Sequence, residues 1–155
     1  PVAVVCAGAK SVLDIGLTLE YLETQGVPVV GFRTNKMPAF YTRDSGYNTP
    51  CRCDSVEELS DMVGAMANIP MRSGMVIVNP IPKEFEADED VIDRATTKAL
   101  REAEKNGITG RDVTPFLLAR IAELTEGASL KANIALVYNN VRLAASVAAG
   151  VIQPD

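Results

Sequence analysis

The sequence predicts an α/β fold, a three-layer α/β/α sandwich built around a parallel sheet. Apolar runs at residues 2–6, 27–32 and 74–78 are typical of buried strands, and an apolar helical pattern separates the first two. Strands that alternate with helices favour a parallel sheet whose faces the helices cover. A length of 155 residues is enough for a domain with a real core, so we expect one α/β portion over residues 1–155.

The first helix is expected to begin at Ser11, because Ser11 and Asp14 form a pattern that resembles a capping box. Two sets of apolar residues predict that this helix is largely buried: Leu13, Leu17 and Tyr21, and then Ile15, Leu19 and Leu22. Gly26 supplies the left-handed residue that ends it. The next strand contains Pro28, which predicts either an edge strand or the first residues of a strand.

Residues 33–52 form a long connection, and loops of this length inside a compact domain are commonly functional. A second helix is predicted to start at Asp54 or Ser55, and Glu58 completes the capping box from Ser55. The strand at residues 74–78 then stops before a proline-rich turn.

The remainder of the chain is predicted to be helical. One helix covers residues 90–106 and ends at Gly107. Thr114 caps the next helix, with a proline at the first helical position. The last helix covers residues 130–149 and carries Asn133 in its first turn.

Lys10 is the main candidate functional residue. It follows the first strand and three small residues, and in open parallel sheets ligands bind beyond the carboxyl ends of the strands. Low-dielectric walls and the positive end of a helix dipole disfavour the charged form of a lysine, which exposes a nucleophilic amine. Asn79 reaches the same edge if the strands are parallel. The alternative is an ordinary solvated lysine on a turn.

Composition excludes several classes of function. The net charge is −5 and no basic stripe is present, which argues against duplex nucleic acid as a partner. The chain contains no histidine, so acid–base chemistry needs other side chains or a partner chain. We expect no membrane association, because no apolar stretch approaches the roughly 20 residues of a membrane span. We expect no secretory signal, because no segment combines a charged, an apolar and a cleavage region.

The three cysteines predict a cytoplasmic protein with reduced thiols, because their number is odd and no secretory signal accompanies them. Cys51 and Cys53 are separated by one residue, a spacing that matches no zinc site. The alternative to a structural role for Cys51 and Cys53 is that the two thiols bind a metal ion together or form a strained redox pair.

Pro1 leads directly into a predicted strand. We therefore expect either that the chain is one piece of a longer protein or that processing frees Pro1. An N-terminal proline is a secondary amine that acts as a base or nucleophile when it is desolvated. A tautomerase-like enzyme that uses Pro1 is thus an alternative to chemistry at Lys10.

Six segments of unusual composition occur along the chain. The first are VVCAGAKS at residues 4–11 and LDIGLTLEYLET at residues 13–24. The others are PAF at residues 38–40, VNPIP at residues 78–82, TPFLL at residues 114–118 and SLKANI at residues 129–134. In sequence and in order, these segments resemble the pseudouridine-5′-phosphate glycosidase family. The resemblance covers essentially the whole chain, but only the C-terminal half of the family's length.

The resemblance implies a glycosidase that reversibly cleaves the carbon–carbon glycosidic bond of pseudouridine 5′-phosphate to uracil and ribose 5-phosphate. Lys10 matches the family's nucleophilic lysine, which forms an imine (Schiff base) with the opened sugar. Asn133 matches a family asparagine that hydrogen-bonds uracil, since an amide offers both a donor and an acceptor. From the residues alone, Asn133 is equally well explained as a local cap.

The resemblance also implies that some catalytic and binding residues of the family are missing from this chain. The proton-donating carboxylate, a phosphate-binding lysine and the aspartate that binds manganese (Mn²⁺) belong to the family's N-terminal half. We therefore expect a second polypeptide that carries the missing half, or a cut enzyme, and a homotrimer of the complete protein. A non-catalytic fragment or binding module that keeps the fold without turnover is the remaining alternative.

Overall fold

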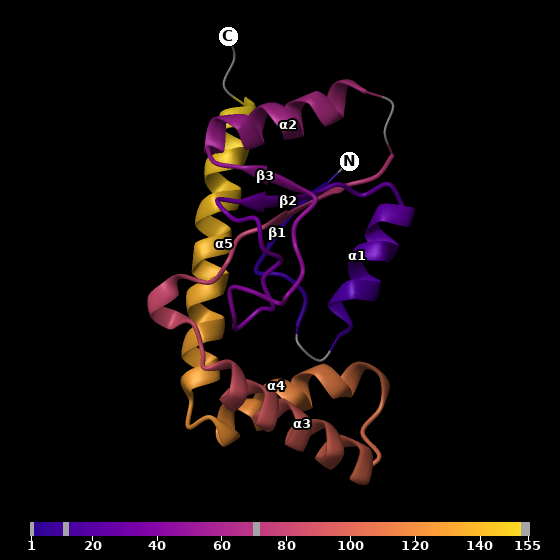
Figure 1. Cartoon of the computed structure of the whole chain (residues 1–155), viewed down its shortest axis with the longest axis vertical. Helices are drawn as coiled ribbons and strands as arrows, with labels where there is room; N and C mark the ends of the chain where they lie inside the picture. Colours follow the sequence, from indigo (N-terminus) through magenta and orange to yellow (C-terminus); the bar gives the residue numbers. More distant parts are fainter. Residues whose placement is uncertain (1, 11–12, 70–71, 153–155) are drawn as a thin grey trace.

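The computed structural model describes residues 2–10, 13–69 and 72–152, and it has the predicted three-layer α/β/α architecture (Figure 1). The strands are β1 (Ala3–Cys6), β2 (Val29–Phe32), β3 (Cys51–Cys53) and β4 (Met75–Val78). The α-helices are α1 (Ile15–Thr24), α2 (Val56–Asn68), α3 (Glu89–Lys105), α4 (Val113–Leu124) and α5 (Ala128–Ile152). Two short 3₁₀ helices, Lys83–Phe85 and Gly110–Asp112, precede α3 and α4.

The four described strands form one parallel sheet in the order β1-β4-β2-β3. In register, Cys6 of β1 lies opposite Val78 of β4, so the two strands end together. Pro28 directly precedes β2, which is an inner strand, and the second of the two expectations for this proline is therefore confirmed. Strand β3 was not predicted, because a run of three residues between polar neighbours carries almost no periodic signal.

Helix α1 differs from its prediction in start and burial. It begins at Ile15, four residues later than expected, because the Asp14 carboxylate caps it and accepts from the Leu17 N–H at 2.9 Å. Ser11 lies outside the described residues. The prediction of a largely buried helix was wrong, since no α1 residue is fully buried. Three of the six apolar residues pack against the sheet: Ile15, Leu19 and Leu22. The other three are exposed: Leu13, Leu17 and Tyr21.

Helices α2 and α5 cover the opposite face of the sheet (Figure 1). Ser55 caps α2 as predicted, accepting from the Glu58 N–H at 3.1 Å. The Ser60 hydroxyl of α2 donates to the Val147 carbonyl of α5 at 3.1 Å, which ties the two helices together. Their buried side chains join those of the sheet in one core cluster: Val30, Cys53, Leu59, Met66, Met75, Ile77, Leu143 and Val147.

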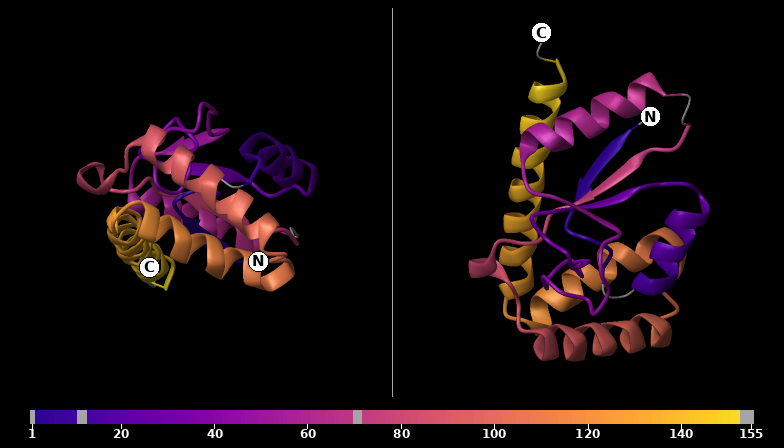
Figure 2. Two further views of the ribbon diagram at one scale, coloured as in Figure 1. Left: turned by 90° about the horizontal axis from the view of Figure 1, so that it is seen from below. Right: turned by 45° about the horizontal axis from the view of Figure 1, so that its top comes forward.

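Helices α3 and α4 pack together at the end of the molecule opposite α2 (Figure 1 and Figure 2). Helix α3 ends before Gly107 as predicted, and Gly107 has a φ of +65°. The prediction that Thr114 caps α4 was wrong by two residues: the N-cap is Asp112 and the helix begins at Val113, because the 3₁₀ turn Gly110–Asp112 runs directly into the helix. Arg120 of α4 forms a forked ion pair with Glu102 of α3, which fixes the pairing of the two helices.

Helix α5 is longer and more apolar than expected. An 18-residue window has a mean hydropathy of 1.3, so length and composition alone would let it cross a membrane. This corrects the expectation that no such stretch exists. The helix nevertheless supplies buried residues to two core clusters, as core helices of globular proteins do: Ala132, Leu136, Leu143 and Val147. Only 17% of the window is buried, and its outer face is uncovered in this chain.

Candidate functional site

The candidate site lies where β1 and β4 end. The Asn79 N–H donates to the Cys6 carbonyl at 2.7 Å, so the two chain segments leave the sheet side by side. Lys10 follows four residues after Cys6 and is half-buried, and its carbonyl accepts from the Leu13 N–H at 2.8 Å. The strands are parallel, and the prediction that Lys10 and Asn79 share one edge of the sheet is therefore confirmed.

The loop that carries Lys10 is held by the segment at residues 38–40. Gly8 forms an antiparallel bridge with Ala39, and the Phe40 N–H donates to the Ala7 carbonyl at 2.9 Å. Gly8 has a φ of +86°, and a Cβ there would lie 1.8 Å from the Pro38 carbonyl oxygen. Only glycine therefore lets the two loops approach this closely.

Asn79 is buried, at 6% exposure, and its side-chain amide donates to Asn140 Oδ1 of α5 at 3.2 Å. The neighbouring Asn139 donates to the Pro80 carbonyl at 3.1 Å. These two contacts attach the middle of α5 to the end of β4. Sequence reasoning missed Asn139 and Asn140, although an asparagine pair inside an alanine-rich helix is a usable signal because asparagine is a poor helix former.

Asn133 lies on the same face of α5 as Asn140, two turns or about 10 Å nearer the N-terminus of the helix. It is half-buried and lies in the second helical turn rather than the first, because α5 begins two residues earlier than expected. Its neighbour Ala132 belongs to the core cluster that also contains Ala7 from the Lys10 loop. Within the described part of the chain no hydrogen bond joins Lys10 to Asn133.

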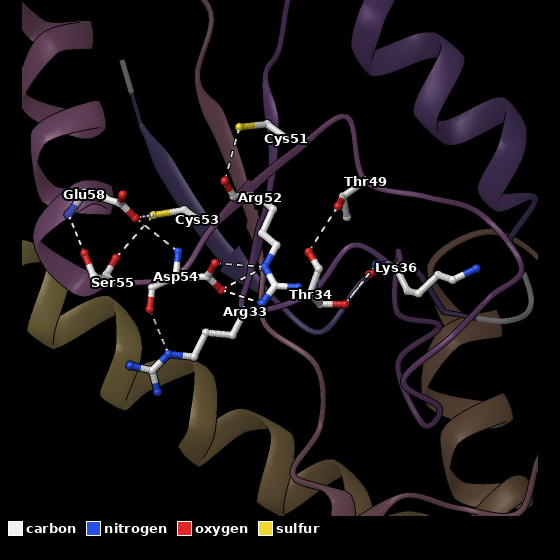
Figure 3. Close-up of polar contacts among 10 residues, drawn as sticks. All are labelled: Arg33, Thr34, Lys36, Thr49, Cys51, Arg52, Cys53, Asp54, Ser55 and Glu58. Atoms are coloured by element: carbon white, nitrogen blue, oxygen red, sulfur yellow. Dashed lines mark hydrogen bonds and ion pairs between the residues drawn. The ribbon is translucent and has the colours of Figure 1, made fainter.

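The cysteines do not form a reactive centre. All three are free thiols, and the Cys53 Sγ donates to Glu58 Oε2 at 3.2 Å and to the Ser55 carbonyl at 3.3 Å (Figure 3). Burial raises the pKa of the Cys53 thiol, and the Glu58 carboxylate raises it further. Burial also raises the pKa of Cys6. A raised pKa disfavours the thiolate that metal binding and nucleophilic attack require, whereas Cys51 is merely exposed on the edge strand.

The described residues do not fit a metal ion, since no three Cys, Asp or Glu side chains among them lie close enough to hold one. A separate cavity of about 570 Å³ lies between α1 and the start of β2, lined among others by Leu19, Glu23 and Tyr47. It is near the amino end of β2, away from the carboxyl ends of the strands where Lys10 lies.

Comparison with known proteins identifies the family. The family model described as indigoidine synthase A like protein matches residues 1–150. The chain belongs to this family. The resemblance to the pseudouridine-5′-phosphate glycosidases seen in the sequence is thereby confirmed, because curated relatives of that name match nearly the whole chain.

Two such relatives of this indigoidine synthase A-like chain show the extent of the match. The pseudouridine-5′-phosphate glycosidase of Clostridium botulinum is 57% identical over 95% of this chain and 48% of its own length. The enzyme of the same name from Hahella chejuensis is 53% identical over 96% of this chain and 49% of its own length. The chain thus spans about half the length of the curated relatives that it matches.

Solved structures confirm the fold. The prealnumycin C-glycosynthase AlnA, crystallised in complex with ribulose 5-phosphate, superposes with a TM-score of 0.83 at 34% identity. An indigoidine synthase A-like protein from Thermotoga maritima superposes with a TM-score of 0.83 at 40% identity. Each match covers 96% of this chain and about half of the other, 49% and 48% respectively.

Proposed function

We propose that this chain supplies the nucleophilic half of an enzyme that reversibly cleaves pseudouridine 5′-phosphate to uracil and ribose 5-phosphate. The observation that carries the proposal is the placement of Lys10, half-buried just beyond the carboxyl end of β1 in a loop clamped by residues 38–40. The 57% identity to a curated glycosidase of that name supports the choice of substrate.

The bond to be broken joins two carbons, so protonation of a nitrogen or oxygen leaving group cannot release uracil. We infer that the Lys10 amine adds to the anomeric carbon of the ring-opened sugar and forms a covalent C–N bond. The bond to uracil then breaks as the uracil carbon takes up a proton, and the sugar remains on Lys10 as an imine. Water hydrolyses the imine to the free amine and ribose 5-phosphate, so one difficult step becomes two easier ones.

We further propose that a complementary polypeptide completes the site with the proton donor and the phosphate-binding lysine. Exposed apolar surface supports such a partner, because patches of this kind mark interaction sites. Two stripes are uncovered on the outer faces of α1 and α5: Leu13, Leu17 and Tyr21, and Leu130, Ile134, Tyr138 and Val141. Strand β1 is an edge strand in the described sheet, with Val2 and Val4 exposed.

For the complete enzyme we propose manganese held by an aspartate of the complementary half, and a homotrimer. Both proposals rest on the family resemblance. The described residues of this chain offer no metal site of their own, so the metal ligand is assigned to the other half. We place the enzyme in the cytoplasm, which three free thiols support because a reducing compartment keeps them unpaired.

Trapping with borohydride tests the function. The chain is mixed with ribose 5-phosphate and the N-terminal half of the Clostridium botulinum relative, produced as a separate polypeptide, and borohydride reduces any imine to a stable amine. We expect the sugar adduct on the peptide that contains Lys10, located by mass spectrometry. An adduct on Pro1, which lies outside the described residues, would favour the tautomerase-like alternative, and no adduct anywhere would contradict the proposal.

Asn133 is proposed to bind the uracil edge through its amide. Replacing Asn133 with alanine should raise the uracil concentration needed for half-maximal synthesis by roughly tenfold, because a neutral hydrogen bond contributes about 1 kcal/mol and its lost partner adds to the cost. The requirement for ribose 5-phosphate should change far less. Asn139→Ala is the matched control, since Asn139 bonds the Pro80 carbonyl. Equal changes for both substrates would argue against uracil binding.

A further inference from the structure

Phe40 has a backbone conformation that few residues other than glycine adopt. Its φ is +68°, and the Tyr41 N–H donates across it to the Ala39 carbonyl at 2.8 Å. A hydrogen bond over three residues with a positive central φ is the strained form of the γ-turn. Glycine would relieve this strain, so the backbone alone does not explain a phenylalanine here.

The ring of Phe40 is fixed in place. It packs edge-to-face on the ring of Tyr41, with centroids 4.8 Å apart and an interplanar angle of 84°. Tyr41 is itself buried, at 4% exposure. The Phe40 N–H donates to the Ala7 carbonyl in the loop that carries Lys10, so backbone and ring are both anchored beside that loop.

The Nζ atom of Lys10 lies over this ring, 5.8 Å from its centroid. The face of an aromatic ring attracts a cation within about 6 Å of its centroid. In the proposed reaction the nitrogen of Lys10 becomes cationic in the protonated imine that remains when the bond to uracil breaks. The ring therefore faces the nitrogen on which this positive charge develops.

We propose that Phe40 is a positioning residue for Lys10, and that its fixed ring holds the reacting nitrogen at the mouth of the loop after β1. This inference rests on the proposed function, but the first of its two measurements is independent of that function. The strained γ-turn is the device that turns the ring toward Lys10 rather than toward solvent.

The first measurement needs no substrate. Lysines of the chain are acetylated with an N-hydroxysuccinimide ester, and the rate at each lysine is followed by mass spectrometry. In Phe40→Leu, which removes the π face, Lys10 should react about threefold faster than in the wild type because its amine is released. In Phe40→Tyr, which keeps the π face, the rate should stay near that of the wild type. Lys36 is the internal control, because its exposed side chain pairs with Asp44.

The second measurement is the borohydride trapping described above. Phe40→Leu should lower the maximal trapping rate on Lys10 by roughly tenfold, because misorientation of a reacting group slows its attack. The ribose 5-phosphate concentration that gives half of the maximal rate should change little. Phe40→Tyr should restore it. Phe116→Leu removes another aromatic ring that packs on the same core cluster, and it should change neither rate.

The two measurements separate the possible failures. If Phe40→Leu leaves both the acetylation and the trapping rates of Lys10 at wild-type values, Phe40 does not position Lys10, while the function stands. If the wild type gives no adduct but Phe40→Leu still accelerates acetylation of Lys10 alone, the positioning stands and the proposed function fails. Faster acetylation of Lys10 and Lys36 together would indicate loosening of the fold and would overturn the inference.

Discussion

Replacing Lys10 with alanine should abolish the borohydride-trapped adduct and lower turnover of the reconstituted enzyme by roughly 10³-fold or more. The proposed reaction requires an amine that bonds to the sugar carbon, and removal of a covalent nucleophile typically costs this much because the other catalytic groups act through it. The measurement is release of uracil from pseudouridine 5′-phosphate, together with the mass of the borohydride-treated chain.

Lys36→Ala is the matched control for Lys10→Ala. Lys36 lies in the loop after β2 with an exposed side chain, and its loss removes the same charge from the chain. We expect near-normal turnover for this variant. If Lys10→Ala also leaves turnover unchanged, Lys10 is not catalytic. The surviving hypothesis is then that this chain is a non-catalytic fragment or binding module.

Gly8→Ala adds only one methyl group, yet it should lower both the stability of the fold and the activity of the site. The added Cβ would lie 1.8 Å from the Pro38 carbonyl oxygen, and the φ of +86° is unfavourable for alanine. We expect a destabilisation of about 2–5 kcal/mol, from the left-handed conformation plus the steric overlap. Because the overlap is with backbone, relief must move the Lys10 loop, so trapping on Lys10 should fall too.

Gly26→Ala separates the steric overlap from the conformational cost. Gly26 has a φ of +64°, but a Cβ there meets nothing within 4 Å. This variant should lose only about 1 kcal/mol, seen as a small drop in thermal midpoint with trapping unchanged. If Gly8→Ala is no less stable than Gly26→Ala, the close approach of the two loops does not exist in solution.

Local signals in the sequence predicted most boundaries of the elements. Ser55 with Glu58, and Gly107, mark helix ends through contacts with their own neighbours, which any chain with these residues can make. The same locality explains why Lys10 and Asn79 could be placed at one edge, since Asn79 directly follows β4 and Lys10 lies four residues beyond β1.

Prediction was less successful where two patterns compete. Helix α1 is apolar on two faces, and nothing local says which face meets the sheet. The expected start at Ser11 was overridden by Asp14, whose carboxylate reaches the Leu17 N–H. Strand β3 pairs with β2 through backbone bonds that leave no periodic trace in three residues.

The sequence by itself determined that this is an α/β protein of a recognisable family, with Lys10 beyond its first strand. The strand order β1-β4-β2-β3, the bond from Asn79 to Asn140 and the ring of Phe40 over Lys10 were decided only by the tertiary structure. The physical reason is separation along the chain, because these contacts join residues 21 or more positions apart. The local propensity of a residue depends on its neighbours in sequence and does not indicate which distant residue it will contact.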